Sequence, residues 1–148
     1  MTCLYPDQSY IPESTNGYSA VMDIRYGSFA ALMTGDLEAD GESMLLQYDF
    51  SGLGFGLRRE GYDVLKVAHH GSRFSSTQEF LEAVSPDLAV ISAGRNNQYG
   101  HPHEETLERL QHTGARILIT SECGEVILQA GLDGKIDVTT KNRLQTDE

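Results

Sequence analysis

From residue 63 onward the sequence alternates short apolar runs with longer amphipathic segments. Runs of strand length cover 63–68, 88–92 and 117–120, and the segments between them repeat apolar residues at helical spacing. Strands that alternate with helices pack into a layered α/β domain, because each helix buries its apolar stripe on the sheet. The sequence therefore predicts an α/β fold with a mixed sheet that carries helices on one or both faces.

The first part of the chain predicts a hairpin followed by one helix. Residues 19–26 alternate polar and apolar side chains as a half-buried strand does, and the apolar run 29–33 follows a glycine turn as its partner strand. A helix is expected over 38–48 and a glycine-rich loop over 50–56.

Both ends of the chain are expected to be irregular. Residues 1–17 contain two prolines and little periodicity, and 141–148 are expected to form a disordered tail. Before that tail, strands over 126–129 and 136–138 flank an Asp-Gly turn signal. With 148 residues, 39% of them apolar, the whole chain (1–148) fits one domain.

Two helix starts carry local signals. Ser76 and Glu79 have the spacing of a capping box, which predicts a helix that begins there and ends before Pro86. Pro102 predicts the start of the next helix, and Gly114 its end.

The charge of the chain limits its partners. Eleven basic and 22 acidic residues give a formal net charge of −11, which would repel a polyanion that is bound through Lys and Arg contacts. This argues against a protein that reads a DNA groove, but not against a metallo-hydrolase, because bound cations reverse the local sign. We expect the chain itself to be soluble, since no run approaches the roughly 18 apolar residues of a membrane helix.

Polar side chains directly follow two of the expected strands. Asp36 comes after the run 29–33 and a glycine, and His69 and His70 follow 63–68. In α/β sheets such strand ends bind ligands. Imidazole and carboxylate groups suit zinc, manganese or iron, and a carboxylate can bridge two cations in a hydrolase. The alternative is structural, with Asp36 in a turn or a helix cap.

The loop before the Pro102 helix is the third candidate. His101 lies next to a helix N-terminus, where free N–H groups can receive an anion, and it could bind a phosphoryl oxygen or donate a proton. The alternative is that His101 only caps the helix, and for His103 we favour a structural role. The nearby serines lack any nucleophile motif, so we interpret them as helix-capping residues.

Three motifs carry a family resemblance. They read Leu-Met-Thr-Gly-Asp-Leu-Glu (32–38), Asp-Val-Leu-Lys-Val-Ala-His-His-Gly-Ser (63–72) and Asn-Asn-Gln-Tyr-Gly-His-Pro-His (96–103). In this order they resemble the later motifs of the metallo-β-lactamase-like domain of ComEC-type DNA internalization competence proteins. The resemblance runs over residues 4–129 and includes Asn16 and Ser19.

The resemblance implies a role for each candidate residue. Asp36 would bridge two divalent metal ions, zinc or manganese, and His69 would be a ligand of the second one. His70 is either the true ligand or a partner that supports it, and His101 would line the same pocket and contact substrate. The implied reaction is phosphodiester hydrolysis by a metal-bound hydroxide, which in this family is thought to degrade the DNA strand that is not imported.

One departure from the family limits what this chain can do alone. The family's His-x-Asp-x-Asp-His or His-x-His-x-Asp-His loop, which supplies most metal ligands, is absent from the 148 residues. We therefore expect the C-terminal half of an αββα sandwich, which binds metal weakly and is inactive alone. Its implied partners are DNA, the missing N-terminal half, and a second copy through the exposed face. The resemblance implies attachment to the outer side of the bacterial plasma membrane in the parent protein.

Two alternatives stay open on the sequence. The same fold could hydrolyse another phosphate ester, such as a phosphorylcholine, or a lactone. The chain could also be a non-catalytic half-domain with a structural or interaction role.

Overall fold

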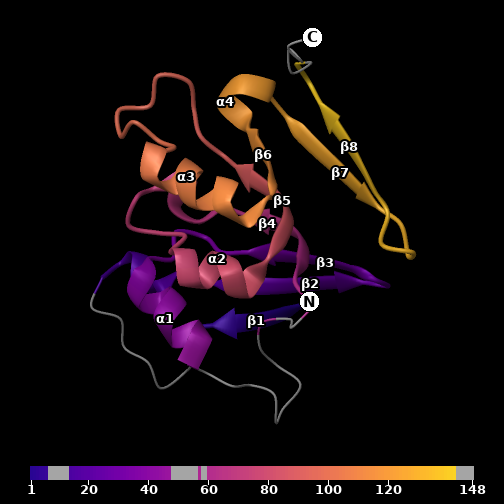
Figure 1. Cartoon of the computed structure of the whole chain (residues 1–148), viewed down its shortest axis with the longest axis horizontal. Helices are drawn as coiled ribbons and strands as arrows, with labels where there is room; N and C mark the ends of the chain where they lie inside the picture. The colour runs from indigo at the N-terminus through magenta and orange to yellow at the C-terminus, as the bar shows by residue number, and fades with distance from the viewer. Residues whose placement is uncertain (7–13, 48–56, 58–59, 143–148) are drawn as a thin grey trace.

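The computed structural model describes residues 1–6, 14–47, 57 and 60–142, and it is built on a six-stranded sheet (Figure 1). In sheet order the strands are β1 (Thr2–Tyr5), β2 (Val21–Tyr26), β3 (Phe29–Met33), β4 (Tyr62–Lys66), β5 (Pro86–Ile91) and β6 (Arg116–Ile119). Strands β1 to β3 pair antiparallel, whereas β3 to β6 pair parallel. The predicted α/β class with a mixed sheet is confirmed.

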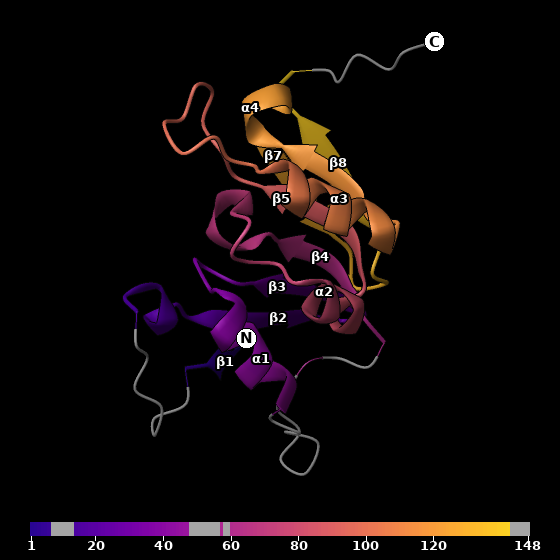
Figure 2. The same cartoon turned by 60° about the vertical axis from the view of Figure 1, so that its left-hand side comes forward.

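Helices cover one face of this sheet and a hairpin covers the other (Figure 2). The helices are α1 (Ala39–Gln47), α2 (Gln78–Val84) and α3 (Glu104–Thr113); the one-turn α4 (Thr120–Cys123) leads into β7 (Val126–Ala130) and β8 (Ile136–Thr140). Because side chains alternate along a strand, Leu65 faces the helices and Val64 faces the hairpin. Each face of the sheet therefore has its own apolar cluster.

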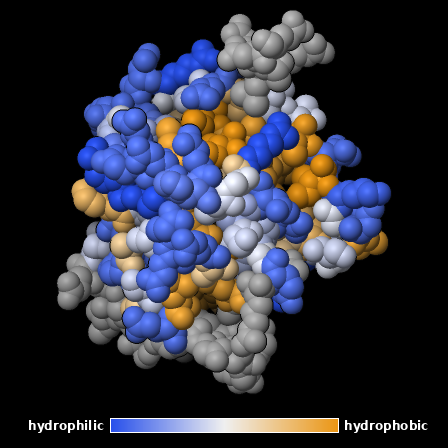
Figure 3. Space-filling model, in the orientation of Figure 1, coloured by the Kyte–Doolittle hydropathy of each residue, from blue (hydrophilic) through white to orange (hydrophobic). Residues whose placement is uncertain are grey.

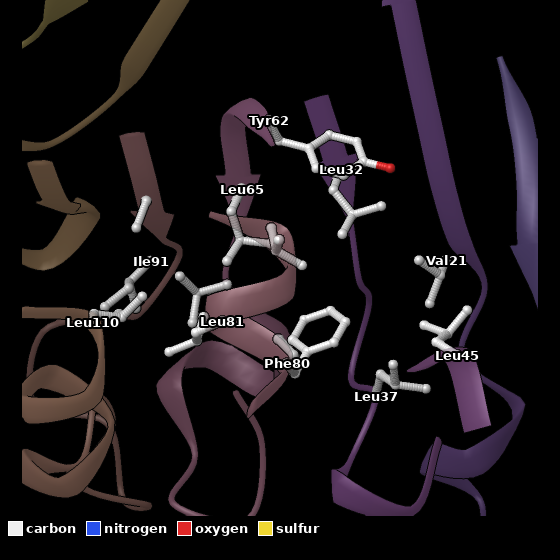
Figure 4. Packing of buried hydrophobic residues seen from close by; sticks show 14 of the residues in the cluster. Val21, Leu32, Leu37, Leu45, Tyr62, Leu65, Phe80, Leu81, Ile91 and Leu110 are labelled. Atoms are coloured by element: carbon white, nitrogen blue, oxygen red, sulfur yellow. The ribbon is translucent and has the colours of Figure 1, made fainter. Parts of the chain in front are cut away.

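The helix side contains the main core. Phe80 of α2 lies among Leu32 and Leu65 of the sheet, and all three side chains are fully buried (Figure 4). On the hairpin side, inward residues such as Leu128 and Val138 are only partly buried. Figure 3 shows apolar residues at the surface along β7 and β8. Within the described ranges, no helix is long and apolar enough to cross a membrane.

Both ends are more regular than the sequence predicts. The irregular structure expected over 1–17 is wrong for Thr2–Tyr5, which forms β1, and for Asn16–Tyr18, which forms a 3-10 turn. Four residues are too few for an alternating pattern to be recognised, and β2 provides the pairing partner. Lys141 and Asn142 also form backbone hydrogen bonds to the segment before β7, so the predicted tail does not begin at 141. The predicted loop 50–56 and residues 143–148 lie outside the described residues.

Both predicted helix starts need correction. The N-cap of α2 is Thr77, whose Oγ1 accepts a hydrogen bond from the Phe80 N–H (3.3 Å), and not Ser76. The capping box fails because a buried carboxylate from α1 takes the local N–H groups instead. Helix α3 begins after His103, which is its N-cap residue, so His101 does not cap it.

Candidate functional site

The candidate residues all lie at one edge of the sheet. Strands β3 to β6 are parallel, so their carboxyl ends meet there, where α/β proteins bind ligands. Asp36 follows β3, His69 and His70 follow β4, and His101 lies in the loop after β5. The fold thus brings together four residues that the sequence singled out separately.

The turn after β3 is held by hydrogen bonds from three directions. Ser19 Oγ accepts the Asp36 N–H (3.0 Å), and the His69 N–H donates to the Gly35 carbonyl (3.0 Å). Asn16 Nδ2 donates to Glu38 Oε1 (2.9 Å). Asn16 and Ser19, which belonged to the sequence resemblance, therefore position the two carboxylates of this turn.

The backbone at the two histidines is strained. His69 (φ 47°) and His70 (φ 58°) are consecutive non-glycine residues in the left-handed region, where each costs about 1–3 kcal/mol. Gly71 follows at φ 85°, and a Cβ there would lie 2.6 Å from Pro102 Cβ. Such strain clusters at functional sites, where surrounding contacts maintain it.

The two imidazoles reach different carboxylates. His70 Nδ1 lies 2.6 Å from the Ser92 carbonyl oxygen, so Nδ1 carries the proton and Nε2 presents a lone pair, 3.7 Å from Asp36 Oδ1. His69 Nδ1 lies 3.4 Å from Glu38 Oε1. That nitrogen is buried, and it makes no hydrogen bond with any described residue.

His101 completes the histidine cluster. Its ring centroid lies 5.7 Å from that of His69 and 6.4 Å from that of His70. Burial lowers the pKa of His101, and the neighbouring charges of His103, His69 and His70 lower it further, while Asp36 opposes them. His101 is therefore neutral near pH 7, which suits a hydrogen-bonding or ligand role.

His103 has the structural role that the sequence favoured. Its Nδ1 accepts the Arg73 N–H (3.1 Å), and its own N–H donates to the Gly71 carbonyl (2.9 Å). These bonds tie the start of α3 to the histidine turn. Among the described residues, no carboxylate lies within ion-pair distance of the His103 ring, whereas His69 and His70 each face one.

Two charged residues that the sequence did not single out hold the segment 73–77, which follows the histidines in the chain. Glu42 of α1 is fully buried, and its carboxylate accepts the N–H groups of Ser76 (2.5 Å) and Thr77 (2.8 Å). From the other side, Arg109 of α3 donates to the carbonyls of Ser76, Ser75 and Arg73. No sequence signal separates these residues from the other acids and arginines of amphipathic helices.

The residues present partly fit a metal ion. No group of three or more His, Cys, Asp or Glu side chains that could hold a metal is found in the part of the chain that the structure describes. Two ligands of one tetrahedral ion, bound at about 2.0–2.1 Å, lie about 3.3 Å apart. The His69–Glu38 and His70–Asp36 separations of 3.4 and 3.7 Å are close to that value, so each pair fits two ligands of an incomplete shell.

Comparison with known proteins shows what the chain is related to. It is 39% identical over 115 residues to ComE operon protein 3 of Bacillus subtilis and 41% identical over 117 residues to Competence protein ComA of Neisseria gonorrhoeae. It is 34% identical over 116 residues to Recombination protein 2 of Haemophilus influenzae. These relatives support a competence-protein family.

The match covers most of this chain but little of the competence proteins. It includes 78% to 79% of the chain and only 14% to 16% of the length of these three relatives. No family model matches the chain. The relatives are therefore much longer proteins, of which this chain corresponds to one segment.

Proposed function

We propose that this chain is part of a metal-dependent phosphodiesterase or nuclease domain that acts on DNA during uptake in competence. The observation that carries the proposal is the convergence of Asp36, His69, His70 and His101 at one sheet edge, with both adjacent histidines in a strained backbone conformation. The names of the competence-protein relatives support the biological setting. The metallo-β-lactamase-like family remains the resemblance that supports the chemistry.

The geometry favours His70 over His69 as the partner of Asp36. A metal-binding histidine usually donates its other ring N–H to a carbonyl or carboxylate, which fixes the ring and its free lone pair. His70 has this arrangement through the Ser92 carbonyl, with Nε2 turned toward Asp36. We propose that His70 and Asp36 hold one divalent ion, zinc or manganese, and that His69 and Glu38 contribute to a second.

A bound divalent ion would supply an acidified water and a positive charge for the phosphate. The residues of this chain then orient and surround it. Neutral His101, beside both histidines, can donate or accept a hydrogen bond at a phosphoryl oxygen. Glu42 and Arg109 hold Ser76 and Thr77 in the segment that follows the histidines, and we propose that they act as positioning residues through this segment.

The remaining ligands would come from outside this chain. We propose that a further segment of the longer protein completes the metal site and packs on the hairpin side of the sheet, where apolar side chains are only partly buried. A second copy of the chain is the alternative occupant of that face. The same arrangement explains why this chain alone would bind metal weakly and catalyse little.

Isothermal titration with manganese and with zinc tests the ligand assignment. We expect Asp36→Ala and His70→Ala to weaken binding of the first ion by roughly tenfold or more, since each removes a ligand. His69→Ala should affect a second, weaker binding event. His112→Ala is the matched control, because His112 is exposed in the last turn of α3, away from the cluster.

The outcomes separate the alternatives clearly. Binding that is equal in wild type, Asp36→Ala and His70→Ala would refute the metal site. If His69→Ala loses binding of the first ion and His70→Ala does not, His69 is the histidine ligand of that ion. A wild-type chain that binds neither ion would favour the non-catalytic half-domain.

A further inference from the structure

A polar cavity adjoins His101 and is not used by the proposed metal site. It has a volume of about 420 Å³ and lies between the loop after β5 and α4, lined by residues that include Arg95, Asn96, His101 and Ser121. Pockets for small ligands span roughly 300–1,000 Å³. The cavity is therefore large enough for a group of the size of a nucleotide.

The loop that lines the cavity is fixed by its own side chains. Asn97 Nδ2 donates to the carbonyls of Gly94 (2.9 Å) and His101 (2.7 Å), and Asn97 Oδ1 accepts the His101 N–H (2.9 Å). Thr120 Oγ1 bonds both the N–H and the carbonyl of Ala93 (3.0 Å each). Asn96 is held in the left-handed region at φ 54°. A loop closed in this way presents a preformed surface to a ligand.

Arg95 places a positive charge at this cavity. Its Nε donates to the Ser121 carbonyl (2.7 Å), which orients the guanidinium, and no carboxylate of the described residues lies within ion-pair distance of it. By contrast, Arg73 is paired with Glu105 at 2.9 Å. In a chain of net charge −11, an arginine that is oriented at a cavity and has no acidic partner among the described residues suits a phosphate.

Tyr99 adds an exposed aromatic ring beside the same histidine. Its ring stacks on His101 with centroids 5.7 Å apart and planes inclined by 24°. The tyrosine is nevertheless 67% exposed, so much of its ring is free for another contact. In proteins that bind single-stranded nucleic acids, exposed aromatic rings stack on the unstacked bases while basic residues contact the backbone.

We propose that this cavity binds a nucleotide of single-stranded DNA next to the scissile phosphodiester, with Arg95 contacting its phosphate and Tyr99 stacking on its base. His101 links the two sites, since it lines the cavity and its ring lies beside those of His69 and His70. The inference rests on the proposed function, because it assigns a substrate-binding position to the same site. It also accounts for how an acidic chain engages DNA through a few local contacts.

The test is a nuclear magnetic resonance titration of the full chain with a thymidine tetranucleotide. We expect amide shifts centred on residues 94–101. Arg95→Ala and Tyr99→Ala should each weaken the affinity by about tenfold, in line with the loss of a phosphate contact or a stacked base. Tyr99→Phe should bind within about twofold of wild type, since it keeps the aromatic ring. Arg116→Ala is the matched control, because Arg116 is an exposed arginine at the start of β6.

A second titration of the same sample, with manganese, separates this inference from the proposed function. Paramagnetic broadening centred on residues 36 and 69–70 reports the metal site, whatever the tetranucleotide does. If the tetranucleotide shifts the expected amides but manganese does not broaden residues 36 and 69–70, the nucleotide subsite stands and the metal site is refuted. The subsite would be overturned if the tetranucleotide caused no amide shifts, or shifts away from residues 94–101. Wild-type affinity in both Arg95→Ala and Tyr99→Ala, or binding of a duplex as strongly as the tetranucleotide, would overturn it as well.

Discussion

The two layers that cover the central sheet are themselves buried to different degrees. On the helix side Leu32, Leu65 and Phe80 expose no surface, whereas on the hairpin side every inward residue of β7 and β8 is only partly buried. Hydrophobic stabilisation grows with the apolar area removed from water. The helix side therefore holds the fold together, and the hairpin side retains apolar area for another contact.

The helix side also supports the segment next to the candidate site, whereas the hairpin side makes no such contact among the described residues. The segment that follows the strained histidine turn is held at Ser76 and Thr77 by polar contacts from α1 and α3, both on the helix side. A functional site needs this kind of support to keep its geometry. The hairpin contributes apolar cover but no clamp of this kind among the described contacts.

Truncating one apolar side chain on each side of the sheet should give the largest difference in stability. Phe80→Ala should lower the free energy of unfolding by about 3–5 kcal/mol, since it opens a cavity in a closed core. Val138→Ala on β8 should cost less, about 1 kcal/mol, because its side chain is already partly exposed to water. Urea denaturation of both variants measures the two values. Similar losses would show that the two faces stabilise the chain equally.

Removing the buried carboxylate should have the next largest effect. Glu42→Ala leaves the N–H groups of Ser76 and Thr77 without their acceptor, and each unsatisfied buried group costs about 1–3 kcal/mol. We expect a loss of about 2–4 kcal/mol in urea denaturation. Glu108→Ala, at an exposed position on α3, is the control and should change stability by less than about 0.5 kcal/mol. If Glu42→Ala leaves the free energy of unfolding unchanged, Glu42 does not act as a positioning residue.

The sequence predicts most of the fold because its periodic segments are long enough to recognise. The apolar runs that became β4, β5 and β6 alternate with amphipathic segments, so the α/β class with a mixed sheet could be predicted. β1 could not, because four residues carry too little pattern and their pairing is set by β2. The start of α2 could not be predicted either, and it lies at Thr77 instead of Ser76. Glu42 makes the contact that Glu79 was expected to make, and Glu42 is 35 residues before Thr77 in the chain.

The site residues could be found from the sequence, but their pairing could not. Asp36, His69 and His70 follow strand ends and His101 precedes a helix start, and these positions made them candidates before the family resemblance was considered. The choice of carboxylate for each imidazole depends on the left-handed turn and on the Ser92 carbonyl, which belongs to another strand end. The sequence could not single out Arg95, because arginines are common in polar loops. Only the structure shows that Arg95 lines a cavity and has no acidic partner among the described residues.

The smallest expected effect is a pH dependence that arises from Glu42 on the helix side. Burial raises the pKa of Glu42, while the hydrogen bonds from Thr77 and Ser76 and the charge of Arg109 oppose the rise. A carboxyl group whose pKa is higher in the folded than in the unfolded state binds more protons when folded. Its stabilising contribution is present below the unfolded pKa, near 4.5, and is lost as the pH rises through the folded value.

Glu42→Gln isolates this contribution, because glutamine keeps the size of the side chain and cannot titrate. We expect the stability of wild type relative to Glu42→Gln to decrease as the pH rises from about 4.5 toward 7, with a smaller total change than Glu42→Ala produces. Urea denaturation at several pH values measures the difference directly. A relative stability that increases with pH would mean that the hydrogen bonds from Ser76 and Thr77 outweigh burial. If the difference in unfolding free energy stays constant with pH, Glu42 is accessible to solvent. The helix side would then be less tightly packed around Ser76 and Thr77 than the burial of Glu42 indicates.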